Sequence, residues 1–340
     1  MRLGTVRSEM SAGMSLEARR PTRTSTRDGD LVVIAHDGTR CASAAAVAPT
    51  LQAALDDWAR AEPPLRALAA RLDAGEIAGE PTAQVEFAAP LPRAYEWLDG
   101  SAFLSHVRLA RKSRGAEPPA DLLTSPLMYQ GGSGRLLGPR DPLPFGDPSL
   151  GLDFEAEIAV VTGDVPAGIS AGDAAPTIRL VCLVNDVTLR ALVPAELAKN
   201  FGFLQAKPPT AFAPYAITPD ELGPDYREGR VHRPVRCFRN GVEVGHADAG
   251  EMFFSFFDLI AHAALTRPLT AGTVIGSGTV SNEDLSRGVS CLVEARMREI
   301  LTAGAPKTEY LRPGETIAIE VRDRDGRDLF GRIEQEVRAP

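Results

Sequence analysis

Short apolar runs separated by glycine and proline dominate the second half of this chain, a pattern typical of β-strands. The runs fall at 179–184, 235–238, 273–276, 290–297 and 316–321. Asn240-Gly241 and Asp325-Gly326 predict tight hairpin turns. A longer apolar pattern around 256–265 predicts one of a few helices in this mostly β region.

The first part of the chain has a different pattern. Residues 8–30 are rich in Arg, Ser and Thr and show little hydrophobic periodicity, so we expect no packed element there. Residues 31–34 predict a strand that enters a turn at Asp37-Gly38. The apolar spacing over 50–72 predicts one or two helices around Pro63-Pro64.

A proline-rich segment, 88–92, follows these elements and is typical of a linker. We therefore predict two domains, a small N-terminal domain over 1–87 and a β-rich domain over 88–340. The predicted fold class is α+β, mostly β.

Two carboxylates interrupt the apolar run at 152–161. Glu155 and Glu157 are two residues apart, so in a strand their side chains project from the same face. Like charges so close on a half-buried surface repel each other unless one is protonated or a cation lies between them. A bound divalent cation is the simplest way to offset this repulsion. The alternative is a solvated strand face with two glutamates that bind nothing.

Other acidic residues could complete such a site. Asp186 follows an apolar run and would emerge at the end of a buried strand; taken alone, its position favours an N-cap for a turn that begins at Val187. Asp99 and His106 share one face if 101–111 is helical, but they could also be an N-cap and a surface histidine. An all-oxygen shell suits Mg²⁺, Mn²⁺ or Ca²⁺ rather than zinc, and its candidate ligands are Asp99, Glu155, Glu157 and Asp186.

Composition excludes several classes of partner. The formal net charge of −8 argues against nucleic acid and anionic membrane surfaces. No apolar window reaches the roughly 18 residues of a membrane span, since the best one, 252–265, contains Asp258 and His262. The four cysteines show no paired spacing, and no signal-type apolar segment is seen, so we expect a cytoplasmic protein.

Common catalytic signatures are missing too. Residues 131–135 lack the closing glycine of a nucleophile elbow, and neither a phosphate-binding loop nor a His-Glu-x-x-His motif occurs. These absences argue against a serine hydrolase, a nucleotide-dependent enzyme and a zinc peptidase.

The order of the candidate residues carries a resemblance to a known family. Along the chain they run Asp99 and His106, Glu155-Ala156-Glu157, Asn185-Asp186, Lys207, Ser277-Gly278-Thr279 and Glu294. In this order the chain resembles the fumarylacetoacetate hydrolase family, in particular its two-domain fumarylacetoacetases, from about residue 30 to residue 337. The resemblance implies a barrel-like N-terminal domain, a catalytic mixed β-roll and a homodimer.

The resemblance also implies roles for individual residues. The four carboxylates would bind one divalent cation, with Mg²⁺ as the first expectation and Ca²⁺ or Mn²⁺ as alternatives. His106 would activate water, Glu294 would orient His106, and Lys207 would stabilise developing charge. The implied substrate-binding residues are Tyr129, Arg111, Arg114, Arg190 and Thr279.

The implied reaction is hydrolysis of a carbon–carbon bond in a 1,3-diketone, such as fumarylacetoacetate or a related acylpyruvate. Two departures bear on the substrate. Thr210 stands three residues after Lys207 where the family usually has threonine four after, and Val193 and Leu197 replace polar substrate contacts. An oxaloacetate-type decarboxylase and a non-catalytic metal-binding scaffold remain as alternatives, although His106 and Glu294 argue against the first and the complete carboxylate set against the second.

Overall fold

A computed structural model describes residues 1–7, 27–113, 115, 117, 120–144 and 147–339 of the chain. Most of the Arg/Ser/Thr-rich segment, 8–26, and the candidate residue Arg114 lie outside the described residues. The statements below concern the described part.

One large sheet of 11 strands organises the fold, in the order β4-β3-β2-β1-β12-β9-β8-β17-β5-β6, with β11 also paired to β9. Neighbours are antiparallel except β17 and β5, which are parallel. Its strands are β1 (Arg2–Val6), β2 (Asp30–Ile34), β3 (Arg40–Ser43), β4 (Glu80–Pro81), β5 (Trp97–Gly100), β6 (Met128–Gly131), β8 (Ala156–Thr162), β9 (Ile178–Asn185), β11 (Ala211–Phe212), β12 (Tyr215–Ile217) and β17 (Val274–Gly276).

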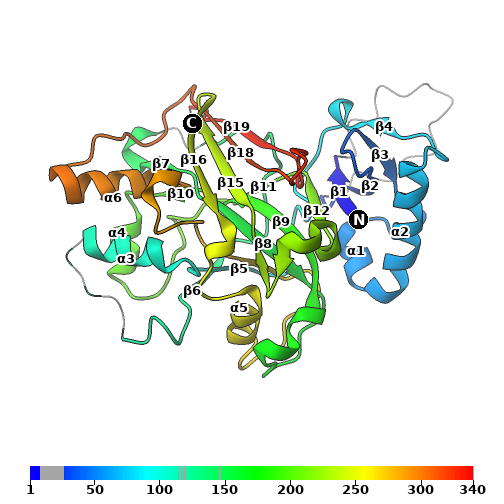
Figure 1. Cartoon of the computed structure of the whole chain (residues 1–340), viewed down its shortest axis with the longest axis horizontal. Helices are drawn as coiled ribbons and strands as arrows, with labels where there is room; N and C mark the ends of the chain where they lie inside the picture. Colours follow the sequence, from blue (N-terminus) through cyan, green and yellow to red (C-terminus); the bar gives the residue numbers. More distant parts are fainter. Residues whose placement is uncertain (8–26, 114, 116, 118–119, 145–146, 340) are drawn as a thin grey trace.

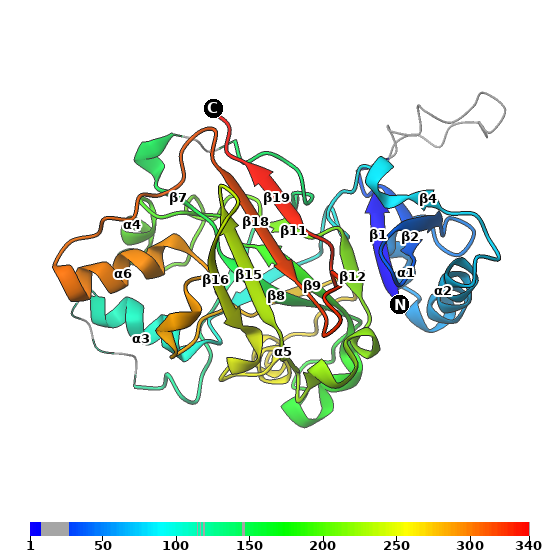
Figure 2. The same cartoon turned by 45° about the horizontal axis from the view of Figure 1, so that its top comes forward.

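A second, four-stranded antiparallel sheet has the order β16-β15-β18-β19 and lies beside β8 and β9 in Figure 2. Its strands are β15 (Pro234–Arg239), β16 (Val242–Asp248), β18 (Thr316–Val321) and β19 (Ile333–Glu336). The predicted turn at Asn240-Gly241 joins β15 to β16, and Asp325-Gly326 lies between β18 and β19. Two short pairs complete the strands: β7 (Leu152–Asp153) with β10 (Thr188–Leu189), and β13 (Tyr226–Arg227) with β14 (Arg230–Val231).

Six α-helices accompany the sheets in the described residues: α1 (Leu51–Leu55), α2 (Trp58–Asp73), α3 (Leu104–Ser113), α4 (Val193–Leu197), α5 (Phe256–Ala263) and α6 (Leu292–Ala303). The break between α1 and α2 falls before Trp58, and Pro63 and Pro64 lie inside α2. Figure 1 shows α1 and α2 with β1–β4 at one side of the molecule and α3 beside α6 at the other. The fold is therefore α+β and mostly β, as predicted.

The prediction of a strand at 290–297 is wrong, because helix α6 begins at Leu292. A short apolar run fits a buried strand and a buried helix turn equally well. Helix-forming residues follow as far as Ala303, and the segment packs against α3. Both favour a helix here.

The core consists of two clusters of buried apolar side chains. One surrounds the second sheet and the adjoining face of the large sheet, with Phe154, Ile158 and Phe330 among its fully buried members. The other joins α1 and α2 to the large sheet through residues such as Leu65 and Trp97. No helix among the described residues has the length and apolar character needed to cross a membrane.

Candidate active site

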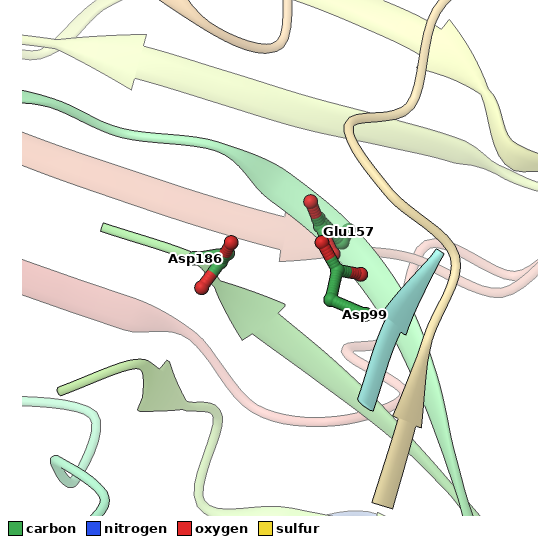
Figure 3. A group of neighbouring side chains, drawn as sticks. All are labelled: Asp99, Glu157 and Asp186. Carbon is green, nitrogen blue, oxygen red and sulfur yellow. The ribbon is translucent and has the colours of Figure 1, made fainter. Parts of the chain in front are cut away.

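Three carboxylates from neighbouring strands converge at one place on the large sheet. Asp99 lies on β5, Glu157 on β8 and Asp186 directly after β9. One ligand oxygen of each lies within 4.8 Å of the others, and Figure 3 shows the three side chains gathered around one space. The sheet order β9-β8-β17-β5 brings together residues that are far apart in the sequence.

Asp99 reaches this group from a strand, so the prediction that it shares a helix face with His106 is wrong. Its strand β5 pairs with β17, and the Gly278 amide donates a hydrogen bond to Asp99 Oδ1 at 3.0 Å. Gly278 has φ +76° and lies so close to the Gly100 carbonyl that a Cβ atom would be 2.2 Å from that oxygen. Glycine is therefore required at the position that brings this amide to Asp99.

The charge balance of the three carboxylates favours a bound cation. Both carboxylate oxygens of Glu157 are buried and have no hydrogen-bond partner in the described structure. Burial, followed by the charge of Asp99, raises the pKa of Glu157 well above its usual range, and burial with the charge of Asp186 does the same for Asp99. Unpaired buried oxygens at this spacing fit the oxygen shell of a hard divalent cation.

Glu155 lies beside this group but has different partners. It lies directly before β8, and the expectation that it shares a face with Glu157 stays a prediction. Its oxygens accept hydrogen bonds from Arg190 at 2.5 Å and from Lys207 at 2.6 Å. Burial disfavours its charged form, but Arg190 and Lys207 outweigh burial and lower the pKa of Glu155. The positive charges of Arg190 and Lys207 thus offset the repulsion between Glu155 and Glu157. The sequence prediction had considered only protonation or a bound cation.

Asp186 is the most heavily hydrogen-bonded member of the site. Oδ2 accepts from the Tyr129 hydroxyl at 2.7 Å and from Lys207 Nζ at 2.5 Å, while Oδ1 accepts from the Thr210 hydroxyl at 2.7 Å. Lys207 also donates to the Thr188 hydroxyl at 2.8 Å. Burial lowers the pKa of Lys207, but the charges of Asp186 and Glu155 outweigh it and raise the pKa, so the ammonium stays charged.

His106 and Glu294 meet as the resemblance implies. His106 Nδ1 lies 2.8 Å from Glu294 Oε1, joining α3 to the first turn of α6. The side chain of Glu294 is 1% exposed and that of His106 is 18% exposed, so the ring remains within reach of solvent. The backbone next to Glu294 is linked to the carboxylates, because Asp153 accepts from the Val293 amide and from Arg190, which also donates to Glu155.

The remaining candidates are less closely engaged. Thr279 is buried next to Gly278, and Arg111 lies half-buried in the last turn of α3. Val193 and Leu197 begin and end the short helix α4, where the Leu197 side chain is exposed. The guanidinium of Arg190 forms ion pairs with Asp153 and Glu155, and its expected contact with the substrate stays a prediction.

Sequence reasoning missed two residues that hold the site together. Thr210 was noted only as a departure in spacing, yet its hydroxyl binds Asp186. Asp153 received no role, although it is fully buried and accepts three hydrogen bonds. Its position two residues before Glu155, in the same apolar run, was the signal that could have found it.

Comparison with known proteins bears directly on this arrangement. The family model described as Fumarylacetoacetate (FAA) hydrolase C-terminal matches residues 96–338, and that for Fumarylacetoacetase N-terminal domain 2 matches residues 20–93. The chain belongs to the fumarylacetoacetate hydrolase family. The C-terminal match includes every residue of the site described above.

Curated relatives show that the family is chemically varied. An oxaloacetate tautomerase of Xenopus laevis is 27% identical over 157 residues, which are 45% of this chain and 47% of that protein. A 2,4-didehydro-3-deoxy-L-rhamnonate hydrolase of Sphingomonas is 27% identical over 159 residues, 46% of this chain and 53% of that protein. The chain thus spans about half the length of these relatives.

A solved structure covers the whole chain. The maleylpyruvate hydrolase of Sphingobium, in complex with manganese (II) ion and pyruvate, superposes with a TM-score of 0.63 and 16% identity. The match covers 100% of this chain and 99% of that one. At this identity the likeness establishes the fold alone, whereas the two relatives above are named as a tautomerase and a hydrolase.

Proposed function

We propose that this protein is a metal-dependent hydrolase that cleaves a carbon–carbon bond in a 1,3-diketo acid, such as fumarylacetoacetate or a related acylpyruvate. The observation that carries the proposal is the 2.8 Å contact between His106 and Glu294 beside the carboxylate group. Hydrolysis needs a general base for water, and a histidine held by a buried carboxylate is suited to that task.

Asp99, Glu157 and Asp186 would hold the cation, with Glu155 as a fourth ligand. Their donor set is all oxygen, which suits Mg²⁺ first and Mn²⁺ or Ca²⁺ as alternatives. A divalent cation bound here would polarise the substrate carbonyls and stabilise the negative charge of the departing enolate. The manganese ion in the Sphingobium maleylpyruvate hydrolase supports this assignment.

The protein's own residues supply the proton transfers. Because Nδ1 of His106 faces Glu294, Nε2 is the nitrogen free to take a proton from water. The resulting hydroxide adds to one carbonyl carbon, and collapse of the tetrahedral species breaks the bond to the central carbon. A carboxylic acid and an enolate result, and the enolate takes up a proton to give the second product.

Lys207 and neighbouring groups would bind the developing charge and the substrate. Lys207 is held charged at the site by Glu155 and Asp186, and its positive charge would stabilise the enolate. Thr279 and Tyr129 would lie near the substrate, and Arg111 or Arg114 would bind its carboxylate. Val193 and Leu197 would favour a less polar acyl group, because aliphatic side chains leave polar substrate atoms unpaired.

Absorbance of the diketone provides the test. We would follow its loss for fumarylacetoacetate and for acylpyruvates with aliphatic or aryl acyl groups, with Mg²⁺, with Mn²⁺ and with EDTA, and identify the products. Cation-dependent release of two acids supports the proposal, and preference for acylpyruvates with longer apolar groups supports the altered pocket. Failure to cleave any diketone under cation-loaded conditions overturns it.

The relatives named as oxaloacetate tautomerases favour a second candidate, proton transfer without hydrolysis. The same panel includes oxaloacetate, whose enol and keto forms differ in ultraviolet absorbance. Faster tautomerisation without bond cleavage would assign the site to this second activity. We also propose a homodimer, as the family resemblance implies, which sedimentation of the intact protein would test.

A further inference from the structure

Helix α6 begins without a capping side chain of its own. Its N-cap residue, Cys291, makes no side-chain hydrogen bond to the helix. The first amides donate instead to a carboxylate distant in the sequence: the Leu292 amide to Asp153 Oδ1 at 2.7 Å and the Val293 amide to Asp153 Oδ2 at 3.0 Å. A buried anion at this end satisfies free amides and complements the helix dipole.

The residue that follows these two amides is Glu294. Its backbone therefore belongs to the turn that Asp153 fixes, and its side chain reaches His106 on α3. Helices α3 and α6 lie side by side in Figure 1. A shift of the first turn of α6 would move Oε1 of Glu294 relative to the imidazole, and hydrogen bonds weaken quickly with distance and angle.

Asp153 is also tied to the other half of the site. Its Oδ2 accepts from Arg190 Nε at 2.9 Å, and the same guanidinium donates to Glu155, which is paired with Lys207. Asp153 is fully buried on β7, which pairs with β10. One carboxylate thus links the helix that carries Glu294 with the charged groups around the three carboxylates.

We propose that Asp153 is a positioning residue that sets Glu294 against His106 and aligns this pair with the charged groups around Lys207. The catalytic part of this inference rests on the proposed hydrolase function, whereas the placement of Glu294 does not. Asparagine has the same shape, but its amide group presents N–H donors where the structure requires an acceptor for a backbone amide or for Arg190.

The first test uses kinetics. Asp153→Asn should lower kcat by roughly 10- to 100-fold while KM changes much less, because small misplacements of catalytic groups have effects of this size. Glu294→Gln and the double variant complete a double-mutant cycle in kcat. If Asp153 acts through Glu294, the double variant should be scarcely slower than the slower single variant, whereas independent effects on kcat would multiply and overturn the proposal.

The second test does not depend on activity. In protein labelled with ¹⁵N at histidine, the ring nitrogens of His106 report which nitrogen carries the proton at a pH where the ring is neutral. The signals would be assigned by their loss in His106→Gln. Wild type should show the proton on Nδ1, and Asp153→Asn should show a mixture, as should Glu294→Gln. An unchanged His106 signal in Asp153→Asn would overturn the proposal.

A rescue variant covers the case in which Asp153→Asn does not fold. Cys291 has φ −158° and ψ 155°, a conformation in which serine can cap the helix. Adding Cys291→Ser to Asp153→Asn should restore folding and move the His106 signal back toward that of wild type. A folded double variant with a wild-type His106 signal would uphold the role of capping, whereas one with the signal of Glu294→Gln would show that capping does not place Glu294.

A matched control tests whether loss of a cap at another helix has the same effect as loss of the Asp153 cap at α6. Thr50 caps α1 in the N-terminal part, where its side chain accepts from the Ala53 amide at 3.1 Å. Thr50→Ala should lower the melting temperature without altering kcat or the His106 signal. If wild type shows no diketone hydrolysis but Asp153→Asn still alters the His106 signal, the proposed function fails and the placement of Glu294 stands.

Discussion

The hydroxyl of Tyr129 donates a hydrogen bond to Asp186 Oδ2 at 2.7 Å, so the tyrosine is directed at a candidate metal ligand. The family resemblance implies that it binds the substrate carboxylate. Its ring contacts Phe203 edge to face, at 5.4 Å from centroid to centroid, and Lys207 Nζ lies 5.3 Å from the ring centroid. The ring is therefore held in place before substrate arrives.

Replacing Tyr129 by phenylalanine separates these two roles. If the hydroxyl mainly serves Asp186, Tyr129→Phe should lower kcat/KM by about tenfold, the equivalent of one hydrogen bond of about 1.4 kcal/mol, through kcat. The loss should be similar for substrates of different acyl group. A rise in KM with unchanged kcat would instead assign the hydroxyl to binding of the substrate carboxylate.

Replacing Glu157 by glutamine should have opposite effects on the metal-free and metal-loaded protein. Without a cation, Glu157→Gln should raise the melting temperature, because it removes a buried carboxyl that faces Asp99 and Asp186. With Mn²⁺, it should lose most of the stabilisation that a ligand at 100 times its Kd provides, about 2.7 kcal/mol. Thermal melts with EDTA and with Mn²⁺ measure both effects.

The exposed Glu251 provides the control for this variant. Glu251→Gln should leave both melts close to those of wild type. Equal stabilisation of Glu157→Gln and wild type by Mn²⁺ would show that Glu157 does not bind the cation.

The stability of the metal-free protein should depend on pH in an unusual direction. Burial and neighbouring charges raise the pKa values of Asp99 and Glu157 in the folded state, so the folded protein binds their protons more tightly than the unfolded chain does. This contribution to the free energy of unfolding is present in full below about pH 4, where these carboxyls are also protonated in the unfolded chain. It is lost as pH rises through the raised folded-state pKa values.

Urea titrations in EDTA across a pH series measure this dependence against Glu157→Gln. As pH rises, the free energy of unfolding of wild type should fall relative to that of Glu157→Gln. Saturating Mn²⁺ should reverse the trend, because the cation binds the deprotonated carboxylates. A difference independent of pH would contradict the raised pKa values.

Removing the proposed base should affect turnover and leave the cation site intact. His106→Ala should lower kcat by about 100-fold or more, the usual contribution of a general base, with nearly unchanged Mn²⁺ affinity. Glu294→Gln should have a smaller effect, since it disturbs the orientation of His106 rather than removing the base. Steady-state kinetics and Mn²⁺ titrations check the pair, and full activity per bound ion in His106→Ala would refute the assignment.

Much of this protein could be read from local sequence. Residues 316–321 form β18 as predicted, Asn240-Gly241 forms the turn between β15 and β16, and the helix predicted around 256–265 is α5. These elements follow from periodicity and turn chemistry over a few residues. The types and order of the acidic residues, with His106 and Glu294, were sufficient to indicate the family and an oxygen-rich site.

The partners of these residues were decided by the tertiary structure. Arg190 and Lys207 reach Glu155 from β-strand ends and loops that fold back on the site. The expected role of Glu155 as a cation ligand stays a prediction. Asp99 was expected on a helix with His106, but β5 pairs with β17 and ends before the helix begins.

The sequence by itself thus determined which chemical groups are present, their spacing along the chain, and the elements with a clear period. Only the tertiary structure decided that 290–297 contributes a helix turn and that Asp153 caps it from 139 residues away. One physical reason is that a short apolar run fits the period of a helix as well as that of a strand. The other is that hydrogen bonds between distant segments depend on sheet order and register, which no local pattern specifies.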